Sequence, residues 1–392
     1  MKRPPPTPTP PNIPDTPGVD DHLALVLSGG GARAAYQVGV LVAIAEHLPQ
    51  LTIPILTGVS AGSINTAHLA AHPGDFRSAV TALRSEWSKL TPDRVYCVRP
   101  VSVARAVLRW LFTWIMRRRK EPGVMRGLMD MTPLRVFLSE CIDFAGIDNN
   151  IGTDRLRAVA LTTTSYTTGR TVTFIQGEPG CPIWSRSQRI GIKGEITVDH
   201  VIASSAIPIV FPAVRLGDGF YGDGSVRQMA PLAPAIHLGA RRILAISMRS
   251  KPPSSEPVVL AGEYPAMAEV MALLFNAVFL DSLDGDAERL VRINQLLENV
   301  PPGGAAPGGI RPVELFMVHP SRDLGELSRG LAPRLPGAVR AVVDSMGGQR
   351  EGSKDFLSYL LFDPAYTDQL VDLGYSDTCA QWGQLEAFLG TV

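Results

Sequence analysis

A serine flanked by glycines is the first group in this sequence that could do chemistry. Gly58-Val59-Ser60-Ala61-Gly62 has the G-x-S-x-G spacing that places a nucleophilic serine on a strained turn between a strand and a helix. The apolar stretch IPILT precedes it, and AGSINTAHLAAH, typical of a helix, follows. The start of that helix would direct backbone N–H groups towards developing negative charge. This context predicts that Ser60 is a nucleophile.

A glycine-rich stretch lies upstream of this serine, directly after the apolar run LALVL. In SGGGARAA, the glycines Gly29, Gly30 and Gly31 allow backbone amides to turn towards one point, as an oxyanion hole requires. The same residues fit G-x-G-x-x-A, a variant of the dinucleotide-binding fingerprint. Against a nucleotide, no acidic residue ends the following strand and no Walker G-K-[ST] occurs. On these residues alone, an oxyanion loop and a phosphate loop both stay open.

A nucleophilic serine also needs a base that accepts its proton. In an ordinary α/β-hydrolase the base is a histidine that follows the serine in the chain. The histidines well downstream of Ser60 are His200, His237 and His319, and His319 in FMVHPS fits best because it follows a predicted strand. That fold, however, builds several strands before its nucleophile, whereas Ser60 follows only the second predicted strand.

Asp223 is a different candidate for the base. It stands between two glycines in GFYGDGSVRQ, after the apolar stretch SSAIPIVFPAV. Such an aspartate is usually a turn residue, but a carboxylate hydrogen-bonded to Ser60 could take the proton without a histidine. Partial burial would then have to keep Asp223 a competent base while leaving it ionised.

The elements that must position these residues alternate along the chain. Short strands are predicted at LALVL, IPILTGVS, LRAVALTTTS, RTVTFIQG and RRILAISM, and helices at ARAAYQVGVLVAIAEHL, AGSINTAHLAAH and PLAPAIHLGA. This order predicts an α/β fold with a mostly parallel central sheet and helices on both faces.

Three regions differ in composition. We expect residues 1–20 to form a disordered, proline-rich tail, residues 21–250 a catalytic core, and residues 251–392 a mainly helical C-terminal extension packed on that core. The short strand VELFMVHPS within the extension is expected to complete the same sheet.

Together, GGGAR, GVSAG and DGS occur in the order and context of the patatin-like phospholipase family, which this sequence resembles over roughly residues 22–389. The resemblance implies a three-layer α/β/α patatin-like fold and hydrolysis of lipid acyl esters by a Ser–Asp dyad. It assigns Ser60 as nucleophile, Asp223 as base, and Gly29, Gly30, Gly31 and Arg33 to the oxyanion hole. Two residues depart from the family pattern, because Ser225 replaces a glycine or alanine and Ala34 replaces a glycine.

Composition and charge exclude other classes of protein. The sequence has 37 Lys and Arg residues and 37 Asp and Glu residues. It therefore lacks the excess of positive charge that would indicate nucleic-acid binding. The four cysteines are not paired as C-x-x-C, and no H-E-x-x-H or acidic calcium loop occurs, so we expect neither metal nor cofactor. The proline-rich start lacks the apolar core of a signal peptide, which predicts a cytoplasmic protein.

One segment predicts peripheral contact with a membrane. VSVARAVLRWLFTWIMRRRK, residues 101–120, is interrupted by arginines and too short in apolar run to span a bilayer. Trp110 and Trp114 lie one helical turn apart, and Arg117 and Arg118 begin a basic cluster, a composition typical of interfacial helices. The alternative is a helix packed on the protein's own core with a solvated basic end.

The sequence therefore predicts a serine hydrolase of fatty-acyl lipid esters, of phospholipase A or lysophospholipase type. Two alternatives belong to other classes: a nucleotide-binding protein that uses the glycine loop, and a catalytically silent lipid-binding protein.

Overall fold

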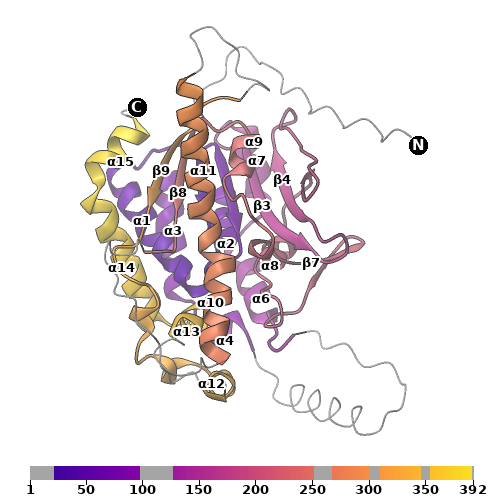
Figure 1. Cartoon of the computed structure of the whole chain (residues 1–392), viewed down its shortest axis with the longest axis vertical. Helices are drawn as coiled ribbons and strands as arrows, with labels where there is room; N and C mark the ends of the chain where they lie inside the picture. Colours follow the sequence, from indigo (N-terminus) through magenta and orange to yellow (C-terminus); the bar gives the residue numbers. More distant parts are fainter. Residues whose placement is uncertain (1–21, 98–126, 251–266, 300–309, 346–353, 391–392) are drawn as a thin grey trace.

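The computed structural model describes residues 22–97, 127–250, 267–299, 310–345 and 354–390 (Figure 1). Its strands are β1 (Leu23–Leu27), β2 (Ile55–Val59), β3 (Ala158–Ser165), β4 (Thr171–Gly177), β5 (Arg189–Lys193), β6 (Val214–Leu216), β7 (Gly219–Asp223), β8 (Arg242–Ile246) and β9 (Glu314–Val318). Its helices include α1 (Ala35–His47), α2 (Ala61–Ala71), α3 (Phe76–Ser88), α4 (Pro92–Val95), α6 (Thr132–Cys141), α7 (Gly146–Gly152), α8 (Val198–Ser204) and α9 (Ala233–His237). The C-terminal helices are α10 (Met267–Phe279), α11 (Asp281–Glu298), α12 (Gly337–Ser345), α13 (Lys354–Leu360), α14 (Pro364–Ala380) and α15 (Trp382–Leu389), and the short 3₁₀ turns η1 (Gly31–Ala34), η2 (Gly224–Val226), η4 (Glu326–Ser328) and η5 (Ala332–Arg334) complete the set.

The strands form one sheet, in the order β5-β4-β3-β2-β1-β8-β9, with the β6–β7 hairpin paired to β3. Strands β3, β2, β1, β8 and β9 run parallel, whereas β4 and β7 are antiparallel to β3. The predicted mostly parallel sheet is therefore confirmed. Because neighbouring parallel strands end at the same edge, the residues that follow β1 and β2 meet there.

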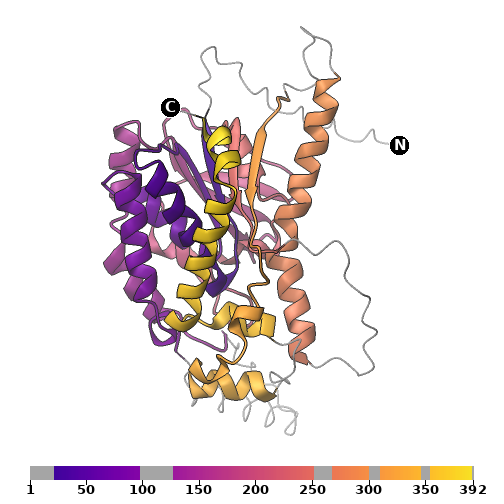
Figure 2. The same cartoon turned by 90° about the vertical axis from the view of Figure 1, so that its left-hand side faces the viewer.

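The two faces of the sheet are covered by different helices. Leu23, Leu25 and Leu27 of β1 belong to a large core shared with α1, α2 and α3. Ala24 and Val26, which alternate with them, belong to a smaller core shared with α9 and α11. Figure 2 shows α1 and α3, in indigo and purple, on one side of the sheet and α10 and α11, in orange, on the other. The fold thus has the predicted three layers.

The described elements beyond residue 250 pack on this framework. Strand β9 lies parallel to β8 at the sheet edge, as the sequence predicts. Helices α1 and α14 approach each other at Gly39 and Gly374, where a Cβ would collide with the carbonyl oxygens of Val371 and Tyr36. The hydroxyl of Tyr36 also donates a hydrogen bond to Asp377, at 3.0 Å.

Some sequence-based expectations concern residues outside the described ranges. The proline-rich tail and the predicted membrane segment 101–120, with Trp110, Trp114, Arg117 and Arg118, lie there. Among the helices that are described, none has the length and apolar content needed to cross a bilayer.

Candidate active site

Ser60 occupies the sharp turn between β2 and α2. Its φ of 54° and ψ of −135° lie outside the regions that most residues favour, and the side chain is only 2% exposed. A Cβ on Gly62 would lie 2.5 Å from the carbonyl oxygen of Ser28, and one on Gly58 would lie 2.8 Å from that of Gly62. Gly62 is therefore required for the close packing of this strained turn against the end of β1, and Gly58 for its packing against the first turns of α2.

Three serines hold the backbone of Ser60. Its N–H donates to the hydroxyl of Ser204 at 3.0 Å. Its carbonyl oxygen accepts from the hydroxyls of Ser63 and Ser205, at 2.6 and 3.0 Å. Ser204 and Ser205 lie in SSAIPIVFPAV, a stretch that supports the family resemblance. The sequence predicts no function for either serine. Their roles depend on folding α8 against the turn, a contact that no local pattern indicates.

Asp223 reaches the same turn from β7. In the sheet, Thr163 of β3 is the partner of Asp223, and Thr162 is the partner of Val59. Because β4 pairs with the other edge of β3, β7 lies on the same side of β3 as β2, and Asp223 comes next in register after Val59, where Ser60 follows. Its carboxylate is fully buried, and Oδ1 accepts a hydrogen bond from the backbone N–H of Ser225 at 2.9 Å.

Burial raises the pKa of Asp223 to about 7, while the hydroxyl of Ser60 and the amide and hydroxyl of Ser225 lower it. Within the described residues Oδ2 has no hydrogen bond of good geometry. Ser60 is therefore close enough to lower the pKa of the carboxylate, but the contact between the two side chains lacks the geometry of a good hydrogen bond. Long or poorly aligned contacts of this kind are common in unliganded active sites.

The glycine loop lies directly beside Ser60. A Cβ on Gly29 would be 2.8 Å from the Cβ of Ser60 and 2.8 Å from Oγ of Ser225. Gly31 has a φ of +57°, and a Cβ there would collide with the carbonyl oxygen of Tyr359. The loop is therefore confined between the serine turn on one side and α13 on the other, and only glycine fits at either position.

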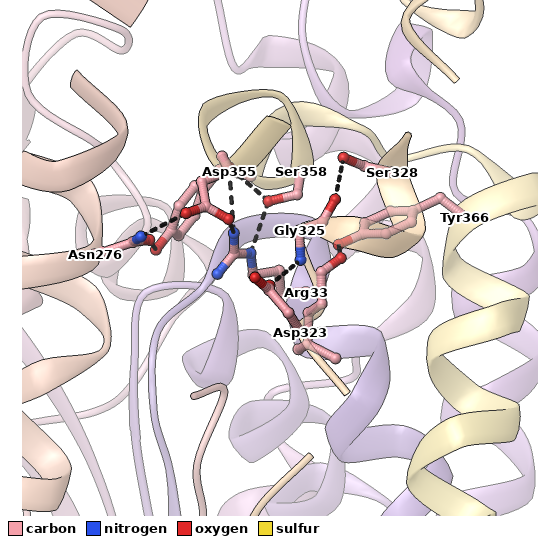
Figure 3. A network of polar contacts seen from close by, with 10 residues as sticks. Arg33, Asn276, Asp323, Gly325, Ser328, Asp355, Ser358 and Tyr366 are labelled. Atoms are coloured by element: carbon pink, nitrogen blue, oxygen red, sulfur yellow. Dashed lines mark hydrogen bonds and ion pairs between the residues drawn. The ribbon is translucent and has the colours of Figure 1, made fainter. Parts of the chain in front are cut away.

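Arg33 follows the loop, and its side chain is buried in a polar network (Figure 3), with 2% of it exposed. Its Nε donates to the Ser358 hydroxyl at 2.7 Å, and its Nη2 donates to the Asp355 carboxylate at 2.9 Å. The guanidinium also lies over the ring of Tyr359, 4.5 Å from its centroid. Burial opposes the charge, but the surrounding tyrosines and aspartates raise the pKa of Arg33 above its ordinary value. A solvated charge at this position is therefore excluded.

The network joins segments that are distant in sequence. Asn276 of α10 donates to the second oxygen of Asp355 at 2.7 Å, and its amide oxygen accepts from the Tyr359 hydroxyl at 3.0 Å. Figure 3 shows Asp355 and Ser358 of α13 on one side of Arg33 and the loop carrying Asp323 and Gly325 on another. The sequence identified Arg33 but none of its partners, which lie more than 200 residues away.

A small pocket with an apolar lining lies beside the serine. Ser60 and Gly31 are among its lining residues, and the rest are mainly aliphatic and aromatic, including Ile64, Leu134 and Phe211. An apolar lining next to a nucleophile suits a hydrocarbon chain better than a charged group.

The histidines considered as bases lie in other surroundings. His319 follows β9, three strands from β2, which is about 14 Å across the sheet. It contacts the carbonyl oxygen of Arg249 and the carboxylate of Asp284. His200 bonds to Thr197 at the start of α8, and the ring of His237 stacks on Trp184. In the described part of the chain, no group of His, Cys, Asp and Glu could hold a metal ion.

Comparisons with known proteins give a family. No curated protein matches the sequence significantly. Among solved structures, human GIVD cytosolic phospholipase A2 in complex with methyl γ-linolenyl fluorophosphonate is 14% identical, with a TM-score of 0.44 over 94% of this chain and 58% of that one. VipD from Legionella pneumophila is 12% identical, with a TM-score of 0.31 over 90% of this chain and 67% of that one. ExoU from Pseudomonas aeruginosa, in complex with SpcU, is 13% identical, with a TM-score of 0.29 over 93% and 60%.

The chain thus spans about three fifths of the length of the human enzyme chain. The family model for patatin-like phospholipases matches residues 25–236, more than half of the sequence, and includes the glycine loop, the serine turn and Asp223. The chain belongs to the patatin-like phospholipase family.

Proposed function

We propose that this chain is a serine acyl hydrolase that cleaves fatty-acyl esters of lipids, of phospholipase A or lysophospholipase type. The observation that carries the proposal is the position of Ser60 and Asp223 at the ends of strands β2 and β7, next to an apolar pocket. Family membership supports a lipid substrate.

In the proposed mechanism, Oγ of Ser60 attacks the ester carbonyl carbon while its proton passes to the carboxylate of Asp223. Amides of Gly29, Gly30 and Gly31 stabilise the resulting oxyanion. The tetrahedral intermediate then collapses, and Asp223 returns the proton to the departing alcohol. Asp223 next takes a proton from water, which attacks the acyl carbon, and Asp223 then returns that proton to Oγ of Ser60 as the Oγ–acyl bond breaks and the fatty acid leaves. Arg33 contributes by holding the loop through α13.

The ionisation of Asp223 sets the expected dependence on pH. The carboxylate must be deprotonated to accept a proton, and burial raises its pKa to about 7. We therefore expect kcat/KM to fall as the pH drops through 7 and to level off above it.

The decisive experiment compares wild type with S60A and D223N on a medium-chain p-nitrophenyl ester and on a defined phosphatidylcholine. S88A and D218N are the matched controls, because both side chains are exposed and Asp218 lies in the same hairpin as Asp223. We expect S60A and D223N to lose activity with folding intact, and the controls to keep it.

Other outcomes would favour the alternatives. Activity that survives D223N but not H319A would indicate a conventional triad. Binding of ATP or NAD without ester hydrolysis would support a nucleotide-binding protein. Lipid binding unaffected by S60A, without turnover by the wild type, would indicate a catalytically silent lipid-binding protein.

Peripheral membrane contact through residues 101–120 is a separate proposal, because that segment lies outside the described residues. Replacing Trp110 and Trp114 with alanine should weaken binding to anionic liposomes, since interfacial tryptophans contribute most of the apolar contact in such helices. Unchanged binding would exclude this segment as the anchor.

A further inference from the structure

Ser225 places a hydroxyl beside the dyad. It lies in η2, two residues after Asp223, and is 6% exposed. Its Oγ is buried without a hydrogen bond of good geometry to any described residue. A buried hydroxyl without a hydrogen-bond partner lowers the stability of the folded protein, so a partner for it is expected.

The surroundings of this hydroxyl are the reacting groups themselves. A Cβ on Gly29 would lie 2.8 Å from Oγ of Ser225 and 2.8 Å from Cβ of Ser60. Hence the Ser225 hydroxyl and the Ser60 side chain both border the place where a Cβ of Gly29 would stand. The Asp223 carboxylate is held at the same residue, because it caps η2 by accepting a hydrogen bond from the N–H of Ser225 at 2.9 Å.

A second buried polar atom at this place also lacks a partner of good geometry, Oδ2 of Asp223. A serine hydroxyl rotates freely and donates one hydrogen bond, whereas an ionised carboxylate only accepts. The two groups are therefore chemically complementary, and the Ser225 hydroxyl lowers the pKa of Asp223. A hydrogen bond to a charged acceptor is stronger than one between neutral groups.

We propose that Ser225 is a positioning residue of the dyad, whose hydroxyl donates to the Asp223 carboxylate and holds its free oxygen towards Ser60. This inference rests on the proposed function. Glycine or alanine, which the family pattern has at this place, would supply the backbone N–H but no hydroxyl. In this chain the base thus has two donors from one residue.

Few charged groups near Asp223 compete with the effect of the Ser225 hydroxyl on its pKa. Burial and, to a smaller extent, the charge of Asp223 raise the pKa of Tyr166, which follows β3. Helix α8 carries Asp199 and His200, and β6 carries Arg215, but none of them shifts the pKa of Asp223. Loss of the Ser225 hydroxyl should therefore change the ionisation of Asp223 directly.

The test measures kcat/KM against pH for wild type, S225A and S225G with the p-nitrophenyl ester. The rate of covalent labelling of Ser60 by a long-chain fluorophosphonate, followed by intact mass, gives a second readout. Without the hydroxyl the carboxylate is less stabilised, so the acidic limb of both profiles should move up by about half to one pH unit. Well above that limb, S225A should keep activity within about threefold of wild type.

Because S225G and S225A differ in volume but both lack the hydroxyl, matching shifts in the two variants would assign the effect to the hydroxyl. S88A should leave the profile unchanged. An unmoved acidic limb, or an equal loss of activity at every pH, would overturn the role of Ser225. If instead S60A or D223N kept full activity, the proposed dyad itself would fail, and the two failures are thereby distinguished.

Discussion

The backbone N–H of Ser60 donates a hydrogen bond to the hydroxyl of Ser204, 3.0 Å away. The same hydroxyl donates to the carbonyl oxygen of Thr162 at 2.7 Å. The fully buried side chain of Ser204, at the end of α8, therefore links the serine turn to β3. Strand β3 in turn pairs with β7, the strand that ends with Asp223. We therefore expect the distance between the two members of the proposed dyad to depend on this link.

We expect S204A to damage both stability and catalysis. The substitution leaves the N–H of Ser60 without its partner in a buried place, which should lower the free energy of unfolding by about 1–3 kcal/mol. A loosened nucleophile should lower kcat by about tenfold or more. Thermal unfolding and ester hydrolysis measure the two effects.

S205A is the matched control for S204A. The Ser205 hydroxyl donates to the carbonyl oxygen of Ser60, but that oxygen keeps two other donors, the hydroxyl and the N–H of Ser63. A smaller effect is therefore expected. Equal effects of S204A and S205A would contradict the role given to the Ser204 link.

The glycine loop supports a second prediction. Alanine at Gly29 would place a methyl group 2.8 Å from both the Ser60 Cβ and the Ser225 Oγ, so the loop or the serine must move. Loss of one aligned oxyanion donor costs about 10²–10³ in kcat, and G29A should lose at least as much. The matched variant G180A adds a methyl group where nothing lies within 4 Å and should be neutral. Near-normal turnover by G29A would show that the loop does not contact the reacting carbonyl.

The sequence predicted the parts of this site that depend on local pattern. Strand β1 occupies Leu23–Leu27 as predicted, because a fully buried parallel strand is a short, continuous apolar run bounded by glycines. The turn at Ser60 is predicted by the G-x-S-x-G spacing between an apolar stretch and a predicted helix. Strand β7 is not predicted, because GFYGD has two glycines around two aromatics and indicates a turn, although the pairing of β7 with β3 positions Asp223.

Long-range contacts could not be predicted in this way. Arg33 meets Asp355 and Ser358 only because α13 folds back over the glycine loop, a separation of more than 300 residues. No periodicity within either segment encodes that meeting. Likewise, the environment that raises the pKa of Asp223 arises from burial beneath several elements and is a property of the fold as a whole.

The Arg33–Asp355 pair yields a third prediction. Removing one partner of a buried ion pair leaves an uncompensated charge and typically costs about 3–5 kcal/mol, so D355A should strongly lower the unfolding temperature. It should also lower kcat, because Arg33 comes two residues after Gly31 and holds the glycine loop in place through α13. The exposed pair Arg249–Asp281, with 44% and 49% of the side chains accessible, offers the comparison, and R249A should change stability by at most about 1 kcal/mol. Similar losses in D355A and R249A would refute a structural role for the buried network.

The buried carboxylate of Asp223 leads to the last prediction, a conflict between stability and function. Its pKa of about 7 in the folded protein lies above the ordinary value of 3.8, so the folded state binds this proton more tightly than the unfolded chain. The stabilising contribution is complete below pH 4 and is lost as the pH rises through 7. At pH 8 the fold therefore bears the cost of an ionised buried group, at most about 4 kcal/mol.

Asparagine at this position carries no charge at any pH. We therefore expect D223N to unfold at nearly the same temperature as wild type at pH 4 and at a clearly higher one at pH 8, although it is inactive. Using the difference between the two proteins removes the effect of other titrating groups, such as the buried His68 and the half-buried His200, whose pKa values burial lowers to about 4. D218N, exposed in the same hairpin, should show no such widening gap. A gap that stays constant with pH would mean that Asp223 is ionised at little cost, and its suitability as a base at neutral pH would need another origin.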